Sequence, residues 1–212
     1  MSLDRTDIAS GLRMLESCHD VVDIVEVGTP FIIKEGVRAV KAIRDAYPDI
    51  TILADLKIMD GGDYSSSLAF EAGANIVTVL AVSADNTIKG VLKAATKHGG
   101  EVLADMISVL GVEERAEQID ALGVDYVGVH TGIDMQAVGE KPVGELARLS
   151  PVLKHARAAA AGGIDLHSLP GILAYNPAIV IAGKSITGAA DPRQMILDMK
   201  AIMEAHGRGE AR

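Results

Sequence analysis

Short apolar runs alternate with amphipathic segments along the whole chain, and this alternation restricts the possible folds more than any other feature. The runs have the length and β-branched composition of buried strands, and the segments between them have helical spacing. The predicted strands cover residues 21–27, 51–57, 75–80, 101–107, 125–129, 156–161 and 178–182. The predicted helices cover residues 8–18, 33–47, 64–72, 86–98, 112–122, 145–155, 166–175 and 192–206, and residues 135–144 mix loop with short helix. Repeated strand–helix units predict a parallel sheet.

Such a sheet can close into an eight-stranded barrel or stay open and doubly wound. The open dinucleotide-binding form is disfavoured, because no G-x-G-x-x-G pattern follows an early strand. We therefore predict an α/β fold, a single (β/α)8 TIM barrel over residues 1–212. Residues 1–4 leave room for a short or truncated first strand, and no linker or low-complexity segment divides the chain.

Composition agrees with this fold and excludes several partners. Hydrophobic residues make up 49% of the chain but aromatic residues only 3%, so a core of Ala, Val, Ile and Leu is expected. The formal net charge of −9 argues against nucleic acid or an anionic membrane surface as a partner, although a small phosphorylated ligand needs only a local cluster of donors. A single cysteine, Cys18, and the lack of a signal peptide or spanning segment predict a cytoplasmic protein.

The stretch from Thr51 to Asp60 is the most informative part of the chain. Alternation along a strand places Leu53, Asp55 and Lys57 on one face, and Asp60 follows the strand end. A carboxylate and an ammonium in an apolar strand are costly unless they pair with each other or with a ligand. A structural ion pair would also explain this pattern, so the neighbouring strands must decide.

Other predicted strands also end in charged residues. Glu26, Asp105 and His130 each lie at the carboxyl end of an apolar run, as Asp55 and Lys57 do. The carboxyl ends of barrel strands form one face, where active sites are built. Any one of these residues could be structural, but together they predict a site.

The last two predicted strands are followed by glycine-rich turns. Gly162 and Gly163 follow one, and Gly183 and Lys184 follow the other. Glycines let backbone N–H groups approach an anion, and phosphate sites after strands seven and eight recur in barrels. A glycine pair is often a simple turn, but this pairing predicts a phosphate site.

With these residues in view, the chain resembles the orotidine 5′-monophosphate decarboxylase suprafamily, and within it the 3-hexulose-6-phosphate synthase family. The segment Asp55–Asp60 matches the D-x-K-x-x-D motif. Supporting stretches lie in the expected order at residues 26–30, 54–62, 77–80, 105–107, 129–134, 161–164 and 186–192. The resemblance implies a homodimeric barrel with shared active sites that binds Mg²⁺ and a phosphorylated ketose.

The resemblance also implies a role for each candidate residue. Glu26 and Asp55 would help to hold the Mg²⁺, and Lys57 would lie beside the enediolate oxygens. Asp60 would reach the partner subunit's site, His130 would transfer protons with Asp105 nearby, and Asp4 matches the aspartate that ends the family's first strand. Gly162, Gly163, Gly183 and Lys184 would surround the phosphate.

The implied reaction joins formaldehyde to D-ribulose 5-phosphate, or runs in reverse. Two alternatives stay open: 3-keto-L-gulonate 6-phosphate decarboxylase, and a sugar-phosphate-binding barrel without catalysis. Lys184 favours the decarboxylase, which tends to have a basic residue there. Asp105 and Ile133 favour the synthase, since the decarboxylase tends to have Glu and Arg at these positions.

Overall fold

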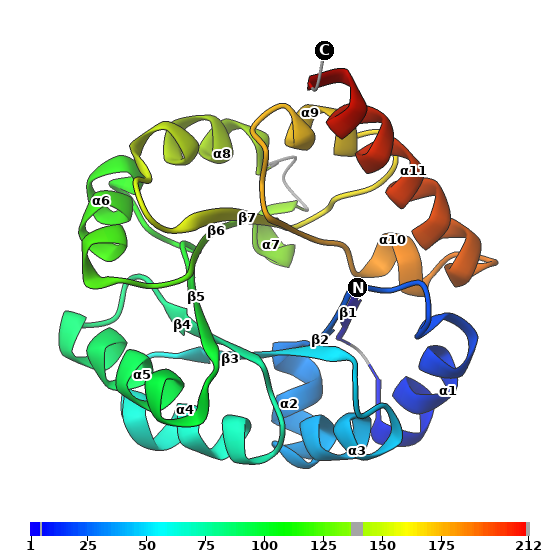
Figure 1. Ribbon diagram of the computed structural model, residues 1–212, viewed down its shortest axis with the longest axis horizontal. Helices are drawn as coiled ribbons and strands as arrows, with labels where there is room; N and C mark the ends of the chain where they lie inside the picture. Colours follow the sequence, from blue (N-terminus) through cyan, green and yellow to red (C-terminus); the bar gives the residue numbers. More distant parts are fainter. Residues whose placement is uncertain (5, 137–141, 211–212) are drawn as a thin grey trace.

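The computed structural model describes residues 1–4, 6–136 and 142–210. Its strands form a parallel eight-stranded sheet in sequence order, and the longer helices surround it (Figure 1). The strands are β1 (Ser2–Leu3), β2 (Ile24–Val27), β3 (Thr51–Ile58), β4 (Ile76–Leu80), β5 (Glu101–Asp105), β6 (Tyr126–His130), β7 (Arg157–Ala161) and β8 (Ile179–Ile181). The backbone N–H of Ser2 donates to the carbonyl of Ala182 at 2.9 Å, so the sheet nearly closes between β8 and β1. The predicted barrel with a short first strand is confirmed.

Helices follow the strands in the expected alternation. They are α1 (Ile8–Cys18), α2 (Thr29–Glu35), α3 (Arg38–Ala46), α4 (Gly62–Glu71), α5 (Asp85–His98), α6 (Val112–Leu122), α7 (Ile133–Gln136), α8 (Val143–Leu149), α9 (Leu169–Leu173), α10 (Lys184–Thr187) and α11 (Pro192–Glu210), with a 3₁₀ turn, η1, at Ser150–Val152. Among the described residues, no helix combines the length and the apolar composition needed to cross a membrane.

Two predicted helices differ from the observed ones for local reasons. The helix predicted at residues 33–47 is two helices, because Gly36 ends α2 with a φ of 67°, a left-handed conformation that suits glycine. The helix predicted at residues 145–155 stops at Leu149, just before Pro151 in the 3₁₀ turn. The mixed stretch predicted at residues 135–144 lies partly outside the described residues.

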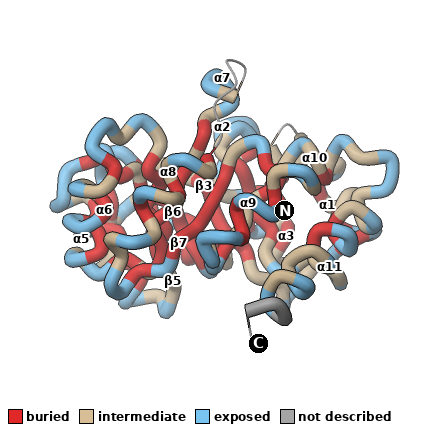
Figure 2. The backbone as a smooth tube through the Cα atoms, turned by 90° about the horizontal axis from the view of Figure 1, so that it is seen from above, coloured by how far each residue is buried: buried red, intermediate tan, exposed pale blue. Residues whose placement is uncertain are grey.

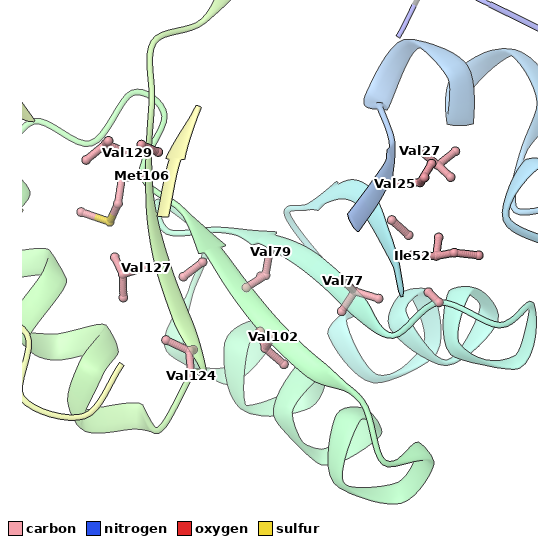
Figure 3. Close-up of a cluster of buried hydrophobic side chains, with 14 of the residues drawn as sticks. Val25, Val27, Ile52, Val77, Val79, Val102, Met106, Val124, Val127 and Val129 are labelled. Atoms are coloured by element: carbon pink, nitrogen blue, oxygen red, sulfur yellow. The ribbon is translucent and has the colours of Figure 1, made fainter. Parts of the chain in front are cut away.

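Apolar side chains form two layers, as strand alternation requires. The inner layer fills the barrel near the amino ends of the strands and contains Leu53, Ile76, Leu103, Tyr126, Ala159 and Ile179. The outer layer lies between the strands and the helices, and Figure 3 labels several of its members. Figure 2 shows the strands buried while the outer parts of the helices are exposed. Because apolar side chains fill the barrel near the amino ends of the strands, a polar site can form only at the carboxyl ends.

Candidate active site

Asp55 and Lys57 form an ion pair at the carboxyl end of β3. The Lys57 ammonium lies 2.9 and 2.7 Å from the two carboxylate oxygens of Asp55. Asp55 lies on the inner face with Leu53, as strand alternation predicts. Lys57 also lies there, but not by regular alternation. The pairing of β3 with β4 shifts register between Ala54 and Ile58, and Lys57 has a φ of 46°. A local irregularity of β3 therefore brings the two charges together.

Asp105 and His130 extend this pair across two further strands. Oδ2 of Asp105, at the end of β5, lies 3.0 Å from Nζ of Lys57 and 2.8 Å from Nδ1 of His130, at the end of β6. The backbone N–H of Ile107 donates to the other Asp105 oxygen at 2.9 Å. The predicted residues Asp55, Lys57, Asp105 and His130 thus form one continuous network, which we call the mouth network.

Burial and neighbouring charges shift the pKa values of the mouth network in opposite directions. Burial alone would lower the pKa of Lys57, but the carboxylates of Asp55 and Asp105 outweigh it and raise that pKa above its ordinary value. Burial likewise opposes the charged form of His130, and Asp105 raises its pKa instead. Burial would raise the pKa of Asp105, yet His130 and Lys57 keep it below its usual range. The network therefore holds a protonated lysine beside an ionised aspartate.

Two threonine hydroxyls that were not predicted as site groups fix Asp55. Thr29 donates to Oδ2 of Asp55 at 2.7 Å, and Thr78 donates to Oδ1 at 2.8 Å. Threonine is common in strands, where Thr78 lies, and near helix starts, where Thr29 lies, so neither residue carried a separate signal. Both residues do lie in stretches on which the family resemblance rests, Thr29 in 26–30 and Thr78 in 77–80.

Glu26, on β2, and Asp4, just after β1, lie on the two strands that precede β3 in the sheet. Glu26 is 8% exposed, and burial together with the nearby charge of Asp55 raises its pKa to about 7. Asp4 accepts a hydrogen bond from the Ser2 hydroxyl at 3.1 Å. Its carboxylate lies against the Cα atoms of Gly28 and Gly183, where any side chain would collide with it or crowd it. Asp4 therefore reaches the mouth despite the short first strand.

Glu26 and Asp55 fit a magnesium ion. Within the described residues, no group of three or more His, Cys, Asp or Glu side chains is arranged to hold a metal. Magnesium does not need one, because it keeps several waters and binds through one or two carboxylates together with substrate oxygens. The two carboxylates are close enough for Asp55 to raise the pKa of Glu26, a repulsion that a cation between them would relieve.

The two predicted phosphate turns also lie together. Gly162 and Gly163, after β7, have φ values of 104° and 65°, which favour glycine. Gly183 and Lys184 begin the turn after β8, and the Ser185 hydroxyl donates to the carbonyl of Ile164 at 2.7 Å, joining the two turns. Lys184 is exposed beside these turns.

Asp60 does not join the mouth network of its own chain. It is exposed beyond the end of β3, and one carboxylate oxygen accepts the N–H of Gly61 at 2.7 Å. Ile133 is 58% exposed at the start of α7. The space enclosed among the mouth network and the strands beneath it is a cavity of only about 10 Å³, so a substrate would lie above it, at the open mouth.

These features define a class: a (β/α)8 barrel with a network of ion pairs, a second buried carboxylate beside it and two glycine turns on one face. The family model for orotidine 5′-phosphate decarboxylase / HUMPS proteins matches residues 1–199, and the chain belongs to this family. It is 45% identical over 203 residues to a protein of Bacillus subtilis (strain 168) named 3-hexulose-6-phosphate synthase, covering 96% of this chain and 97% of that one.

Solved structures of related proteins share this fold. A 3-hexulose-6-phosphate synthase from Salmonella typhimurium superposes with a TM-score of 0.94 at 41% identity, with 97% of each chain covered. A 3-keto-L-gulonate-6-phosphate decarboxylase from Vibrio cholerae superposes with a TM-score of 0.85 at 25% identity, covering 97% of this chain and 96% of that one.

Proposed function

We propose that this chain is a 3-hexulose-6-phosphate synthase, a carbon–carbon lyase that condenses formaldehyde with D-ribulose 5-phosphate and catalyses the reverse cleavage. The observation that carries the proposal is the mouth network, in which Lys57 is held between two carboxylates beside His130. Full-length similarity to relatives with this name supports it.

The chemistry follows from the charges. A proton leaves C1 of the ribulose phosphate, and the resulting enediolate attacks the formaldehyde carbon, whose oxygen then takes up a proton. The Lys57 ammonium stabilises negative charge on the enediolate oxygens, since a preorganised cation at a partly buried site acts strongly. His130, oriented by Asp105, carries the proton.

Mg²⁺, held by Glu26 and Asp55, would add Lewis-acid stabilisation of the same oxygens. The backbone N–H groups of Gly162, Gly163 and Gly183, with the Lys184 ammonium, would bind the phosphate. This arrangement assigns the metal and the phosphate to different strand ends, so the reacting carbon would lie between them.

The site is shared between two copies of the chain in this proposal. Asp60 lies outside its own network, and exposed apolar side chains occur on the elements next to it: Met59 after β3, Ile33 on α2, and Tyr64 and Leu68 on α4. A two-fold interface over this surface would bury them and present Asp60 reciprocally to the partner subunit's Lys57.

The second candidate function is 3-keto-L-gulonate 6-phosphate decarboxylation, favoured by the cation Lys184 beside the phosphate turns. Against it, Ile133 offers no positive charge to a substrate carboxylate. Both assays should therefore be run with Mg²⁺. We expect formaldehyde consumption with ribulose 5-phosphate to exceed decarboxylation by a wide margin, and Ile133→Arg to raise the decarboxylase share.

A native preference for decarboxylation would overturn the synthase assignment. Binding of the sugar phosphate with neither turnover would favour the non-catalytic barrel.

Subunit complementation tests the shared site. Asp55→Ala and Asp60→Ala homodimers should each be nearly inactive. A heterodimer of the two would contain one site with both lesions and one with neither, so mixing should recover up to about half of the native activity per heterodimer. No recovery despite confirmed heterodimers would mean that Asp60 serves its own chain.

A further inference from the structure

Strand β3 leaves its regular pairing just before the catalytic lysine. Ala54 pairs with Val77 and Ile58 pairs with Val79, so residues 55–57 lie opposite a single residue of β4, Thr78. Within this irregularity Lys57 has a φ of 46°, in the left-handed region that a lysine seldom adopts. Something other than the strand ladder must hold it there.

The Thr78 hydroxyl holds the backbone of Lys57 in place of a strand hydrogen bond. It accepts the backbone N–H of Lys57 at 2.8 Å and donates to Oδ1 of Asp55 at 2.8 Å. Thr78 is 2% exposed, and its neighbours Val77 and Val79 belong to the outer apolar layer (Figure 3), so Thr78 points into the barrel. A single buried hydroxyl thus joins the backbone of Lys57 to the carboxylate that pairs with its ammonium.

We propose that Thr78 is a positioning residue that holds Lys57 in its left-handed conformation and so sets the place of its ammonium. The proposal rests on the proposed function in taking Lys57 as the group that contacts the enediolate. A small displacement of the Lys57 ammonium should lower kcat more than substrate affinity. Its contacts with the substrate oxygens strengthen as negative charge develops on them in the transition state. Valine has the shape of threonine but can neither accept from Lys57 nor donate to Asp55.

Thr29 provides a matched comparison. Its hydroxyl donates to Oδ2 of Asp55 at 2.7 Å and contacts the Asp55 carbonyl at 2.9 Å, whereas the Lys57 backbone bonds to Thr78. Thr29→Val therefore loosens Asp55 alone, while Thr78→Val loosens Asp55 and Lys57 together. The difference between the two variants isolates the hold on Lys57.

The kinetic test compares Thr78→Val, Thr78→Ser and Thr29→Val. We expect Thr78→Val to lower kcat by about 10- to 100-fold, the range for hydrogen bonds that involve charged groups, with little change in KM for ribulose 5-phosphate. Thr78→Ser should restore most of kcat, and Thr29→Val should lose less than Thr78→Val. Equal losses in the two valine variants, or a loss mainly in KM, would overturn the proposal.

A second readout does not depend on turnover. Trace acetylation followed by mass spectrometry compares Lys57 with exposed Lys41 and Lys93 in the same sample. Lys57 should react faster in Thr78→Val than in the native protein, in Thr29→Val or in Thr78→Ser, while Lys41 and Lys93 stay unchanged. An unchanged Lys57 rate would overturn the positioning role. Absence of synthase activity in the native protein would instead overturn the proposed function and leave this labelling result to decide on Thr78.

Discussion

The two sides of the barrel hold their charges in different ways. On the side of β3, β5 and β6, each member of the mouth network contacts another charged side chain within 3.0 Å. On the opposite side, which we call the seam, β1 has two residues and β8 has three. Glu26 lies beside the seam with its pKa raised to about 7 by burial and by Asp55. Lys57, Asp105 and His130 have opposite charges beside them, whereas Glu26 faces the like charge of Asp55, a repulsion that the proposed Mg²⁺ would relieve.

The two sides of the barrel also differ in how tightly their side chains pack. A cavity of about 350 Å³ lies at the seam and extends to Glu26. Apolar side chains of β2, β3, β8 and α11 line much of it, among them Ile24, Leu53, Ile179, Ile196 and Met199. The space below the mouth network is only about 10 Å³. Since protein interiors are normally close-packed, the seam is packed more loosely than the space below the mouth network.

The largest effect that tests this contrast concerns the metal. Excess EDTA should abolish turnover and Mg²⁺ should restore it, because Lys57 is already paired with Asp55 and Asp105 and cannot replace the Lewis acid proposed beside Glu26. Glu26→Gln should weaken Mg²⁺ binding by about tenfold or more, measured by titration calorimetry with ribulose 5-phosphate present.

Asp105→Asn is the matched control on the other side. It should lower turnover but leave Mg²⁺ affinity nearly unchanged. Full activity in excess EDTA, or equal losses of Mg²⁺ affinity in the two variants, would remove the proposed division of roles.

A pair of isoleucines tests the packing contrast. Ile88 on α5 is fully buried, and Ile196 on α11 is 5% exposed and lines the seam cavity. Ile88→Ala should lower the free energy of unfolding by about 3–4 kcal/mol, but Ile196→Ala by only about 1–2 kcal/mol, because a side chain beside a cavity has fewer contacts to lose. Urea unfolding measures both. Equal losses would mean that the cavity is filled or collapsed in solution.

Much of the fold could be predicted because its signals are local. Apolar runs placed seven of the strands within a few residues of their observed bounds, and the charged residues at their ends located the mouth network. The break at Gly36 was missed, because glycine is tolerated within helical patterns as well as at their ends. The seam cavity could not be predicted, since it depends on how α11 packs against β8 and β2.

The site, like the fold, could be predicted only where its signals are local. Alternation correctly put Asp55 on the inner face with Leu53, but the register shift that carries Lys57 depends on β4 as well as on β3. Thr29 and Thr78 were not identified as site residues, because a buried threonine in a strand or at a helix start has an ordinary structural reading. Their role follows only from three-dimensional contacts with Asp55 and Lys57.

The smallest effect concerns the pH dependence of the mouth network. Asp105 raises the pKa of His130 above its ordinary 6.5, so the folded state binds a proton more tightly than the unfolded state. The stabilisation is therefore fully present below about pH 6.5 and is lost as the pH rises through the folded-state pKa. His130→Gln can retain a hydrogen bond to Asp105 but cannot titrate.

From about pH 6 to about pH 9, the stability advantage of the native protein over His130→Gln should shrink by about 1 kcal/mol, the difference between a charge-assisted and a neutral hydrogen bond. Urea unfolding of both proteins at each pH measures it, and subtraction removes the groups that they share. An advantage that grows with pH would mean that burial outweighs Asp105 and that His130 is held neutral. The mouth network would then depend on Lys57 alone for its positive charge.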